Sequence, residues 1–365
     1  VYAAPGRINL IGEHTDYNNG FVFPGAVQQG IIAEIKPNGT RMVRAYAIDL
    51  KDYVEFSLDD EAGPAATWAR YIFGVCREMM ALGVPVEGFN TAFAGDVPLG
   101  AGMSSSAALE SCFAFALNDI WGGNKVEKME LARVGQRTEH KYVGCNCGIM
   151  DQFASVHGKK GSLMRLDCRS GEFEYFPFNP EGYKLVLVNS QVKHELVGSP
   201  YNDRRRSCER VAEAIHKLHP EVESLRDASY EQLDEVRGQV SEEDALRAHY
   251  VIGERERVLT VCDALEKGDY ETVGKMMYET HEGLSKEYEV SCEELDFLND
   301  VAREEGVTGS RIMGGGFGGC TINLVAEELY DHFVKVVKEK FAAKYGKDPI
   351  IIDVVIGDGA RKLEA

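Results

Sequence analysis

Several features that mark particular classes of protein are missing from this sequence. It has no run of about 18 apolar residues, so it predicts no transmembrane helix. Its first residues show neither the basic segment nor the apolar segment of a secretion signal. We therefore expect a cytoplasmic protein without a membrane partner. The chain begins at Val1 without a methionine, and we expect a leading piece to be missing.

The cysteines lack the spacing of metal-binding or redox pairs. None of the nine stands in a C-x-x-C pair, and Cys145 and Cys147 are the only closely spaced couple. An odd number of cysteines without such pairs is typical of reduced intracellular thiols. We expect neither disulfides nor a zinc site.

Positive charge is also scarce, because 40 basic residues stand against 59 acidic ones and the net charge is −19. Proteins that bind nucleic acid need basic surface to displace the counterions of the phosphates. We therefore expect no nucleic-acid partner. An anionic substrate would need local help from backbone amides, a few arginines and a divalent metal.

The common nucleotide-binding motifs are absent or out of context. No G-x-x-x-x-G-K-[ST] motif occurs. Residues 314–319 satisfy G-x-G-x-x-G, but the next segment, Thr321 to Val325, has the pattern of a strand where a dinucleotide site requires a helix. These glycines instead predict a hairpin whose backbone presses on another site.

What the chain does contain is a loop of small residues, Pro98 to Ala107, that runs into a helical pattern. Apolar residues recur there at helical spacing, at Leu109, Phe113, Ala116, Leu117 and Ile120. Gly100 and Gly102 let a ligand approach the backbone, and the free N–H groups and dipole of the helix start favour an anion. By itself the loop fits a serine-capped helix after a glycine turn equally well.

A second loop, Gly12 to Gly20, is densely polar. Arg7 precedes it, and Glu13, His14 and Asp16 lie within it beside apolar strands. Such donors and acceptors suit a polyol. A metal site is the competing functional interpretation, which the single histidine disfavours. A solvated turn would explain only the Asn-Gly end.

Three further segments have two interpretations each. Asp151 stands among apolar neighbours, where it either caps a helix or is a paired, functional carboxylate. Trp68 and Tyr71 lie in a predicted helix over 66–83 and form part of the core or an adenine platform. The arginines of 204–206 form a solvated face or an anchor beside the polar loop.

The pattern of elements predicts an α+β protein with two domains and a boundary near Pro180. We expect strands at 8–12, 21–24, 31–35, 89–94, 162–167, 172–178, 185–188, 321–325 and 350–356. We expect helices at 66–83, from about 105, at 125–142, through most of 201–305, and at 328–344.

Three separated blocks, residues 6–18, 98–107 and 313–321, resemble motifs of the GHMP small-molecule kinases. The first block resembles the signature of the members that phosphorylate galactose. The resemblance implies an α+β, two-domain fold with the active site in the cleft between an N-terminal α/β domain, residues 1–180, and a C-terminal α+β, ferredoxin-like domain, residues 181–365. It implies transfer of phosphate from ATP to the anomeric hydroxyl of galactose with Mg²⁺, and we expect a monomer.

The resemblance also assigns residues. The implied catalytic residues are Asp151 and Arg7. The implied sugar-binding residues are Glu13, His14, Asp16, Gly148, Asp151 and Tyr201. The implied ATP-binding residues are Gly100, Ala101, Gly102, Met103, Ser104, Ser105, Ser106, Ala107, Trp68 and Tyr71. The implied Mg²⁺ ligands are Glu139 and Ser106, with Ser105 as the alternative serine.

Two other functions remain open at this level. One is a kinase for a related sugar such as N-acetylgalactosamine or arabinose. The other is a non-catalytic sensor of sugar and ATP on the same fold. The combination of Glu139, Asp151 and the serines at 104–106 argues against a sensor, which needs binding but not this full set.

Overall fold

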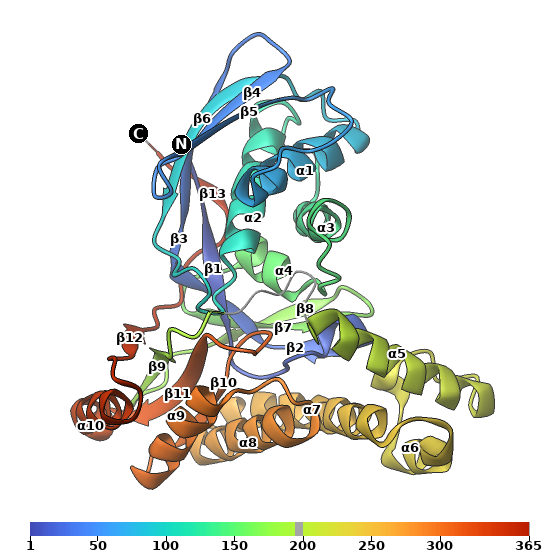
Figure 1. Cartoon of the computed structure of the whole chain (residues 1–365), viewed down its shortest axis with the longest axis vertical. Coiled ribbons are helices and arrows are strands. Elements are labelled where there is room, and N and C mark those ends of the chain that lie inside the picture. The colour runs from blue at the N-terminus through green and yellow to red at the C-terminus, as the bar shows by residue number, and fades with distance from the viewer. Residues whose placement is uncertain (194–199, 365) are drawn as a thin grey trace.

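The computed structural model describes residues 1–193 and 200–364, which form an upper and a lower lobe joined at a narrow waist (Figure 1). The upper lobe is built on a six-stranded sheet in the order β13-β1-β3-β6-β4-β5. Its strands are β1 (Tyr2–Asn9), β3 (Pro24–Pro37), β4 (Met42–Ala47), β5 (Asp52–Ser57), β6 (Phe89–Gly95) and β13 (Arg361–Lys362). All neighbours pair antiparallel except β4 and β6, which are parallel.

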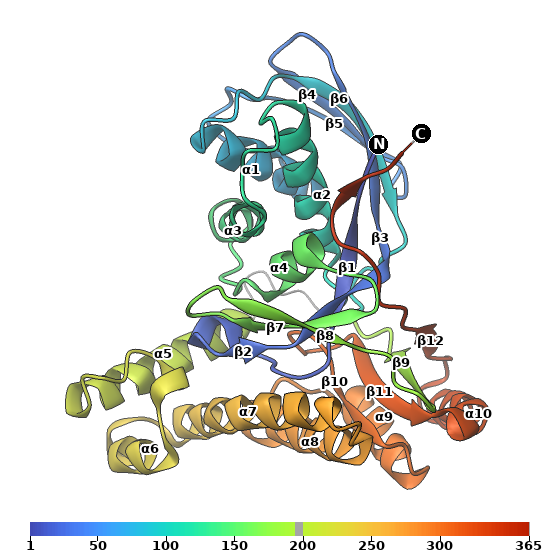
Figure 2. The same cartoon turned by 180° about the vertical axis from the view of Figure 1, so that it is seen from behind.

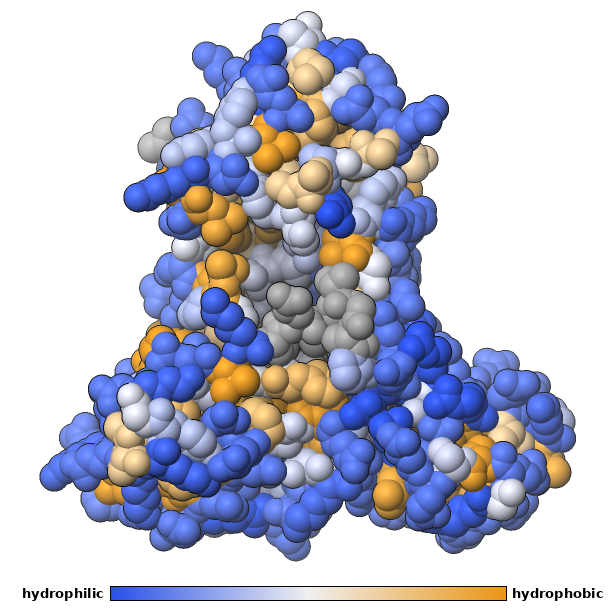
Figure 3. Space-filling model, viewed as in Figure 1, coloured by the Kyte–Doolittle hydropathy of each residue, from blue (hydrophilic) through white to orange (hydrophobic). Residues whose placement is uncertain are grey.

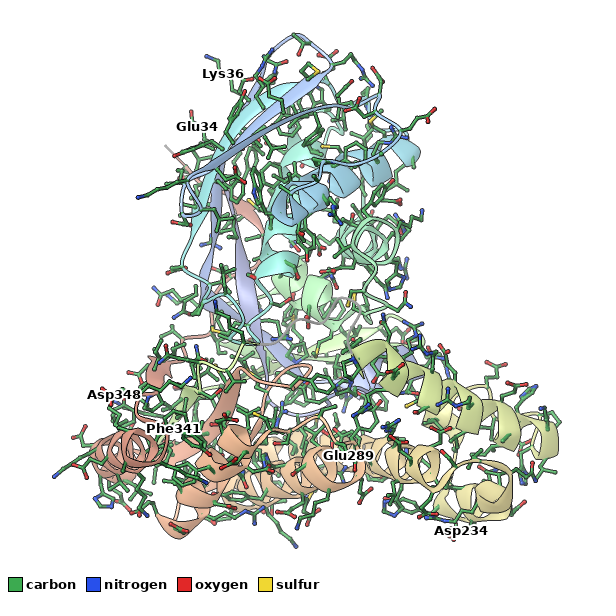
Figure 4. The ribbon with its side chains drawn as sticks, in the orientation of Figure 1. Glu34, Lys36, Asp234, Glu289, Phe341 and Asp348 are labelled. Atoms are coloured by element: carbon green, nitrogen blue, oxygen red, sulfur yellow. The ribbon has the colours of Figure 1, made fainter. Side chains whose placement is uncertain are left out.

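Alternation along β3 shows how this sheet acquires one buried face. Ile31, Ala33 and Ile35 point into the core, whereas Glu34 and Lys36, which alternate with them, are exposed. Figure 4 shows these two charged side chains projecting away from the lobe. Because side chains alternate between the two faces of a strand, this pattern requires helices on one face only.

Four helices lie on the buried side of the upper sheet, and the third of them packs on the other three helices and not on the strands (Figures 1 and 2). They are α1 (Thr67–Ala81), α2 (Ser105–Ile120), α3 (Lys128–Thr138) and α4 (Met150–His157). The residues that predicted α2 are buried or half-buried, and the predicted start of α2 is confirmed. The helix predicted over 125–142 begins later, at Lys128, and ends in a wider π-helical turn, Glu139–Val143.

A three-stranded sheet lies beneath these helices at the waist. It consists of β2 (Phe21–Val22), β7 (Ser162–Asp167) and β8 (Phe173–Pro177) in the order β2-β7-β8. The strands predicted at 162–167 and 172–178 are thereby confirmed. The strand predicted at 8–12 is wrong in its bounds, because β1 ends at Asn9 and the chain turns at Gly12 with a positive φ of 94°.

The lower lobe has an antiparallel four-stranded sheet in the order β10-β11-β9-β12. Its strands are β9 (Tyr183–Asn189), β10 (Gly309–Ile312), β11 (Cys320–Ala326) and β12 (Ile350–Asp353). Its helices are α5 (Pro200–Leu218), α6 (Tyr230–Val236), α7 (Glu242–Glu266), α8 (Tyr270–Glu282), α9 (Glu293–Glu304) and α10 (Glu327–Tyr345). The α+β class is confirmed, as is the hairpin around residues 314–319, which connect β10 to β11.

The chain does not divide cleanly at residue 180. That position lies between β8 and β9, yet the last strand, β13, returns to pair with β1. Residue Ile356 also bridges back to Val27. The boundary between two domains therefore stays a prediction. Figure 2 shows both chain ends together at the upper sheet.

Polar residues cover most of the face seen in Figure 3, with apolar residues in scattered patches. Over residues 1–193 and 200–364, no helix is both long enough and apolar enough to cross a membrane.

Candidate active site

A cavity of about 590 Å³ lies at the waist, between the lobes. The predicted site residues that line it are Arg7, Glu13, His14, Asp16, Tyr71, Gly100, Gly102, Met103, Ser104, Ser105, Ser106, Glu139, Gly148, Asp151 and Tyr201. Segments more than 300 residues apart meet there, because Gly315 of the β10–β11 hairpin lines the same cavity as Arg7. The structure thus brings the three sequence blocks together.

Three predicted residues do not line this cavity. Ala101 and Ala107 belong to the loop 98–107, which we call the glycine loop, but both are buried. Trp68 points away from it, donating its indole N–H to Asp52 at 2.8 Å and packing against Phe93. Tyr71, one helical turn further on, does reach the cavity together with Thr67 and Arg70.

Arg7 and Asp151 form an ion pair at the centre of the cavity. The guanidinium Nε of Arg7 donates to Asp151 Oδ1 at 2.8 Å, and its Nη1 donates to the carbonyl of Gly102 at 2.5 Å. Burial alone would lower the pKa of Arg7, but the charges of Asp151 and Glu13 raise it. Asp151 lies in the first turn of α4 and is paired rather than capping a helix. The pair thus connects the start of α4 to the glycine loop.

The carboxylate of Asp16 fits closely against the backbone of the segment that carries Asp151. Its Oδ2 accepts from the N–H of Met150 at 3.3 Å and its Oδ1 from the N–H of Tyr17 at 3.0 Å. A side chain at Gly148 would overlap this carboxylate, so only glycine allows the approach. Burial and then the charge of Asp151 raise the pKa of Asp16 to about 6.

Both ring nitrogens of His14 are engaged by the protein. Its Nε2 lies 3.0 Å from the carbonyl oxygen of Gly315, and its Nδ1 lies 2.6 Å from the hydroxyl of Tyr17. Burial lowers the pKa of His14 to about 4, so the ring is neutral near pH 7. A carbonyl can only accept, so Nε2 carries the proton and Tyr17 donates to Nδ1. A sugar hydroxyl would have to displace one of these bonds to reach a ring nitrogen.

Glu13 anchors the polar loop to the lower lobe. Its Oε1 accepts from Arg311 Nη2 and from the N–H of Gly314, both at 3.0 Å. The backbone of the same loop receives bonds from α7, where Tyr250 donates to the carbonyl of Glu13 at 2.9 Å. Glu254 accepts from the N–H of Gly12, also at 2.9 Å. The polar loop is therefore fixed from below before any ligand binds.

The loop before α2 presents its backbone to the cavity. Ser104 stands at the N-cap of α2 with a positive φ of 60°, and its side chain makes no capping hydrogen bond. The alternative interpretation of this loop, a helix capped by a serine side chain, is therefore wrong. The first N–H groups of α2 remain available for an anion, and the helix dipole adds positive charge there.

The β10–β11 hairpin forms a wall behind this loop. A Cβ atom at Gly102 would lie 3.1 Å from the carbonyl oxygen of Met313, and one at Gly314 would lie 3.1 Å from the carbonyl oxygen of Gly102. Gly319 packs equally tightly on Ala101. The prediction that these glycines press on another site is confirmed.

Glu139 and Ser106 both line the cavity beside the start of α2 and lie close to each other. Burial raises the pKa of Glu139 to about 7. The neighbouring Glu110 is fully buried, and burial together with the charge of Glu139 raises its pKa well above the usual range. Two buried carboxyl groups and a hydroxyl are hard oxygen donors of the kind that Mg²⁺ prefers. The donor set therefore fits this cation.

Protein groups alone do not complete such a site. Within the described residues no group of three or more His, Cys, Asp or Glu side chains is arranged to hold a metal ion. Oxygen atoms of a bound phosphate chain would have to supply the remaining ligands, as is common for Mg²⁺.

Some functional contacts were not anticipated from the sequence. Glu110 accepts from Gln152 at 3.0 Å and thereby connects the region of Glu139 to the neighbour of Asp151. Its signal was present, because it is the one carboxylate in the otherwise small and apolar stretch 107–117. Arg311 and Glu254 gave no such signal, since their partners lie far away in sequence.

The arginines at 204–206 divide between the two interpretations. Arg204 is buried and donates to the carbonyls of Tyr288 and Glu289 at 2.7 and 2.6 Å. Arg205 donates to the carbonyl of Asn146 at 2.8 Å, over the ring of Tyr17. Arg206 is exposed and pairs with Asp203. Two of the three therefore anchor α5 beside the cavity.

Family models match most of the chain in three segments. Residues 1–37 match the galactokinase galactose-binding signature, residues 70–159 the GHMP kinases N terminal domain, and residues 262–341 the GHMP kinases C terminal model.

Known proteins of similar sequence share the whole length of the chain. A galactokinase of Thermotoga maritima is 40% identical over 99% of both chains. One of Clostridium acetobutylicum is 39% identical over all of this chain and 94% of its own. The crystal structure of Lactococcus lactis galactokinase complexed with galactose superposes with a TM-score of 0.94, at 32% identity, over 99% of this chain and 94% of that one.

A more distant structure shares the fold alone. The mevalonate kinase of Methanococcus jannaschii has a TM-score of 0.69 at 18% identity, covering 98% of each chain. Fold, site and sequence agree, and the chain belongs to the GHMP kinase family and, within it, to the galactokinases.

Proposed function

We propose that this chain transfers the γ-phosphoryl group of ATP to the anomeric hydroxyl of galactose, giving galactose 1-phosphate and ADP. The observation that carries the proposal is the Arg7–Asp151 ion pair, which lies where the polar loop meets the glycine loop. A phosphoryl acceptor held by the first loop and a phosphate chain held by the second would meet at this pair.

Asp151 accepts the proton of the attacking hydroxyl. The guanidinium of Arg7 donates to Asp151 Oδ1 and orients this carboxylate. Arg7 also holds the attacking hydroxyl and stabilises the negative charge that develops on the transferred group.

Sugar recognition comes from the polar loop and its surroundings. Asp16 and Glu13 offer carboxylate oxygens, and the hydroxyl of Tyr201 lies in the same lining. Buried acceptors left without partners are costly, so a sugar whose hydroxyl points the wrong way is rejected strongly. His14 contributes by fixing the position of the loop, since both of its ring nitrogens are in use.

The nucleotide occupies the other end of the cavity. The free N–H groups at the start of α2 hold the phosphates, and Tyr71 with Arg70 faces the same space. Ser106 and Glu139 would hold Mg²⁺, which when bound neutralises charge on the β- and γ-phosphates. All of these groups come from one chain, and we propose that the protein acts as a monomer.

A sugar panel tests the proposal. ADP release is measured with ATP, Mg²⁺ and galactose, glucose, N-acetylgalactosamine or arabinose in turn. We expect galactose to give the highest kcat/KM. A higher value for another sugar would replace the proposed substrate, and binding of galactose without any ADP release would indicate a sensor.

A further inference from the structure

Two cysteines with no part in the proposed reaction lie in the cavity wall. Cys145 and Cys147 both line the cavity, on the loop between the π-helical turn and α4. They stand two residues apart on this loop, and their side chains lie close to each other. Cys145 is buried and Cys147 is half-buried. Cys168 and Cys292 are half-buried outside this cavity, and the other five cysteines are buried.

The pair lies between the two halves of the site. Both cysteines line the same cavity as Tyr71, at the proposed nucleotide end, and Tyr201, at the proposed sugar end, and they lie near both tyrosines. Cys147 also lies near Glu139. A change of bonding at this pair therefore occurs between the groups proposed to hold the two substrates.

The loop that carries the thiols is tightly held at its backbone. The carbonyl of Cys147 accepts from His140 Nε2 at 2.7 Å and from Gln136 Nε2 at 3.3 Å. The next residue, Gly148, packs against the carboxylate of Asp16 with no room for a side chain. A covalent bond that pulls Cys147 toward Cys145 would therefore disturb the close contact between Gly148 and Asp16.

We propose that Cys145 and Cys147 form a dithiol modification site, and that oxidation of the pair to a disulfide by an azodicarboxamide such as diamide reversibly weakens sugar binding. The two thiols lose two protons and two electrons as the S–S bond forms. The N=N bond of the oxidant takes up both and becomes a hydrazine. A dithiol reductant returns the pair to thiols.

The resting state of the site is the dithiol. The hydrogen bond from Cys145 and burial raise the pKa of Cys147 well above its usual range, so this thiol is protonated at neutral pH. Because the thiolate is the reactive form, dissolved oxygen reacts slowly and a strong thiol oxidant is needed.

The test treats the full chain with diamide and makes two independent measurements. Mass spectrometry follows the tryptic peptide 142–159, which contains Cys145 and Cys147 and no other cysteine. We expect its mass to fall by about 2 Da, because a disulfide has lost two hydrogens. Calorimetry without ATP follows galactose binding. We expect affinity to fall roughly tenfold or more, through loss of the Asp16 contacts, and to return with dithiothreitol.

Matched serine variants assign the effect to this pair. Cys145→Ser and Cys147→Ser are each compared with their own untreated sample, and we expect diamide to leave their galactose affinity unchanged. Cys292→Ser removes a half-buried thiol outside the cavity and should respond like the parent protein. If a serine variant fails to fold, the parent with saturating galactose replaces it, and we expect the ligand to slow disulfide formation.

The inference rests on the proposed function only because galactose is the ligand whose binding is measured. Failure of the proposed function and failure of the inference give different results. If untreated protein does not bind galactose, the proposed function is wrong. If it binds and peptide 142–159 keeps its mass, or loses 2 Da without a change in affinity, the inference is overturned. Equal loss of affinity in the serine variants would overturn it as well.

Discussion

Among single residues, Asp151 bears most directly on the chemistry. We expect Asp151→Asn to bind galactose and ATP but to lower kcat by roughly 10² or more, because the amide cannot accept the proton. Asp59→Asn is the matched control, since it also removes an aspartate paired with an arginine, Arg41, but far from the cavity. Single-turnover rates and calorimetry separate chemistry from binding. A turnover near that of the parent protein would mean that Asp151 is not the base.

The raised pKa of Asp16 predicts that the free energy of unfolding depends on pH. Its pKa in the folded protein is about 6, above the ordinary value of 3.8. The folded state therefore holds a proton that the unfolded state releases, and the free energy of unfolding falls as pH rises from about 4 to about 6. We expect Asp16→Asn without ligand to be about 1–2 kcal/mol more stable than the parent at pH 7, because asparagine carries no charge to bury. The new amide repels the Met150 N–H, which offsets part of this gain.

Urea unfolding at several pH values checks this expectation. The advantage of Asp16→Asn over the parent should shrink as pH falls from about 6 to about 4, because Asp16 takes up its proton in the folded protein over this range. His14, whose pKa is lowered to about 4, has the opposite slope between about 4 and 6.5, but it is present in both proteins and cancels. A constant difference across the range would argue against a raised pKa at Asp16. Galactose binding by Asp16→Asn should be weaker, with ATP binding unchanged.

Site residues could be predicted from the sequence where they stand in motifs, but the residues that they contact could not. Arg7, Glu13 and Asp16 stand in one recognisable block. Glu13 is paired with Arg311, 298 residues away, and such a pairing leaves no local pattern. Trp68 shows that a residue can also be predicted wrongly. It lies one helical turn from Tyr71 and was an equally good candidate from the sequence, but its side chain points to Asp52 and not into the cavity.

At the scale of elements, the contact between the glycine loop and the β10–β11 hairpin is testable. Gly102 and Gly83 both have positive φ, at 78° and 85°, but only Gly102 has a close neighbour, the Met313 carbonyl. Each change to alanine should cost about 1–2 kcal/mol of backbone strain. We expect Gly102→Ala alone to weaken ATP binding, with galactose binding retained. Calorimetry measures both ligands, and equal effects of the two variants would show that the contact does not matter.

Elements with regular periodicity were predicted well, and their irregular ends were not. The helix expected over 125–142 has a continuous pattern, yet it changes to a π-helical turn at Glu139. A π turn inserts one residue without breaking the helical pattern, so periodicity does not reveal it. The turn contains the residue proposed to hold Mg²⁺, in keeping with the frequent occurrence of such turns at functional sites.

At the scale of the whole molecule, Arg311 joins the lobes. It is fully buried, pairs with Glu13, and donates to the carbonyls of Asn9 and Leu10. We expect Arg311→Met to lose about 3–5 kcal/mol of unfolding free energy, because the buried carboxylate of Glu13 loses its cationic partner and keeps only the Gly314 N–H. Arg206→Met, which removes an exposed ion pair, should cost less than about 1 kcal/mol. Urea unfolding distinguishes them, and similar losses would contradict the role of Arg311 as a link.

The two-lobed architecture could be predicted because three blocks resemble motifs of the GHMP kinases. The periodicity of apolar residues alone does not predict it. Alternation and helical spacing predict the α+β class. They do not predict that β13 returns to the upper sheet beside β1, because a two-residue strand has no pattern. Nor do they predict that α7 supports the polar loop, a contact between segments more than 200 residues apart.

The central claim is that the cavity at the waist joins galactose and ATP for phosphoryl transfer. Phosphorus NMR of a reaction with galactose, ATP and Mg²⁺ tests it most directly, because it identifies the product. The account predicts the appearance of the α-galactose 1-phosphate signal together with ADP, and its absence in Asp151→Asn over the same time. Loss of ATP to inorganic phosphate, or a phosphate on any hydroxyl other than the anomeric one, would contradict it.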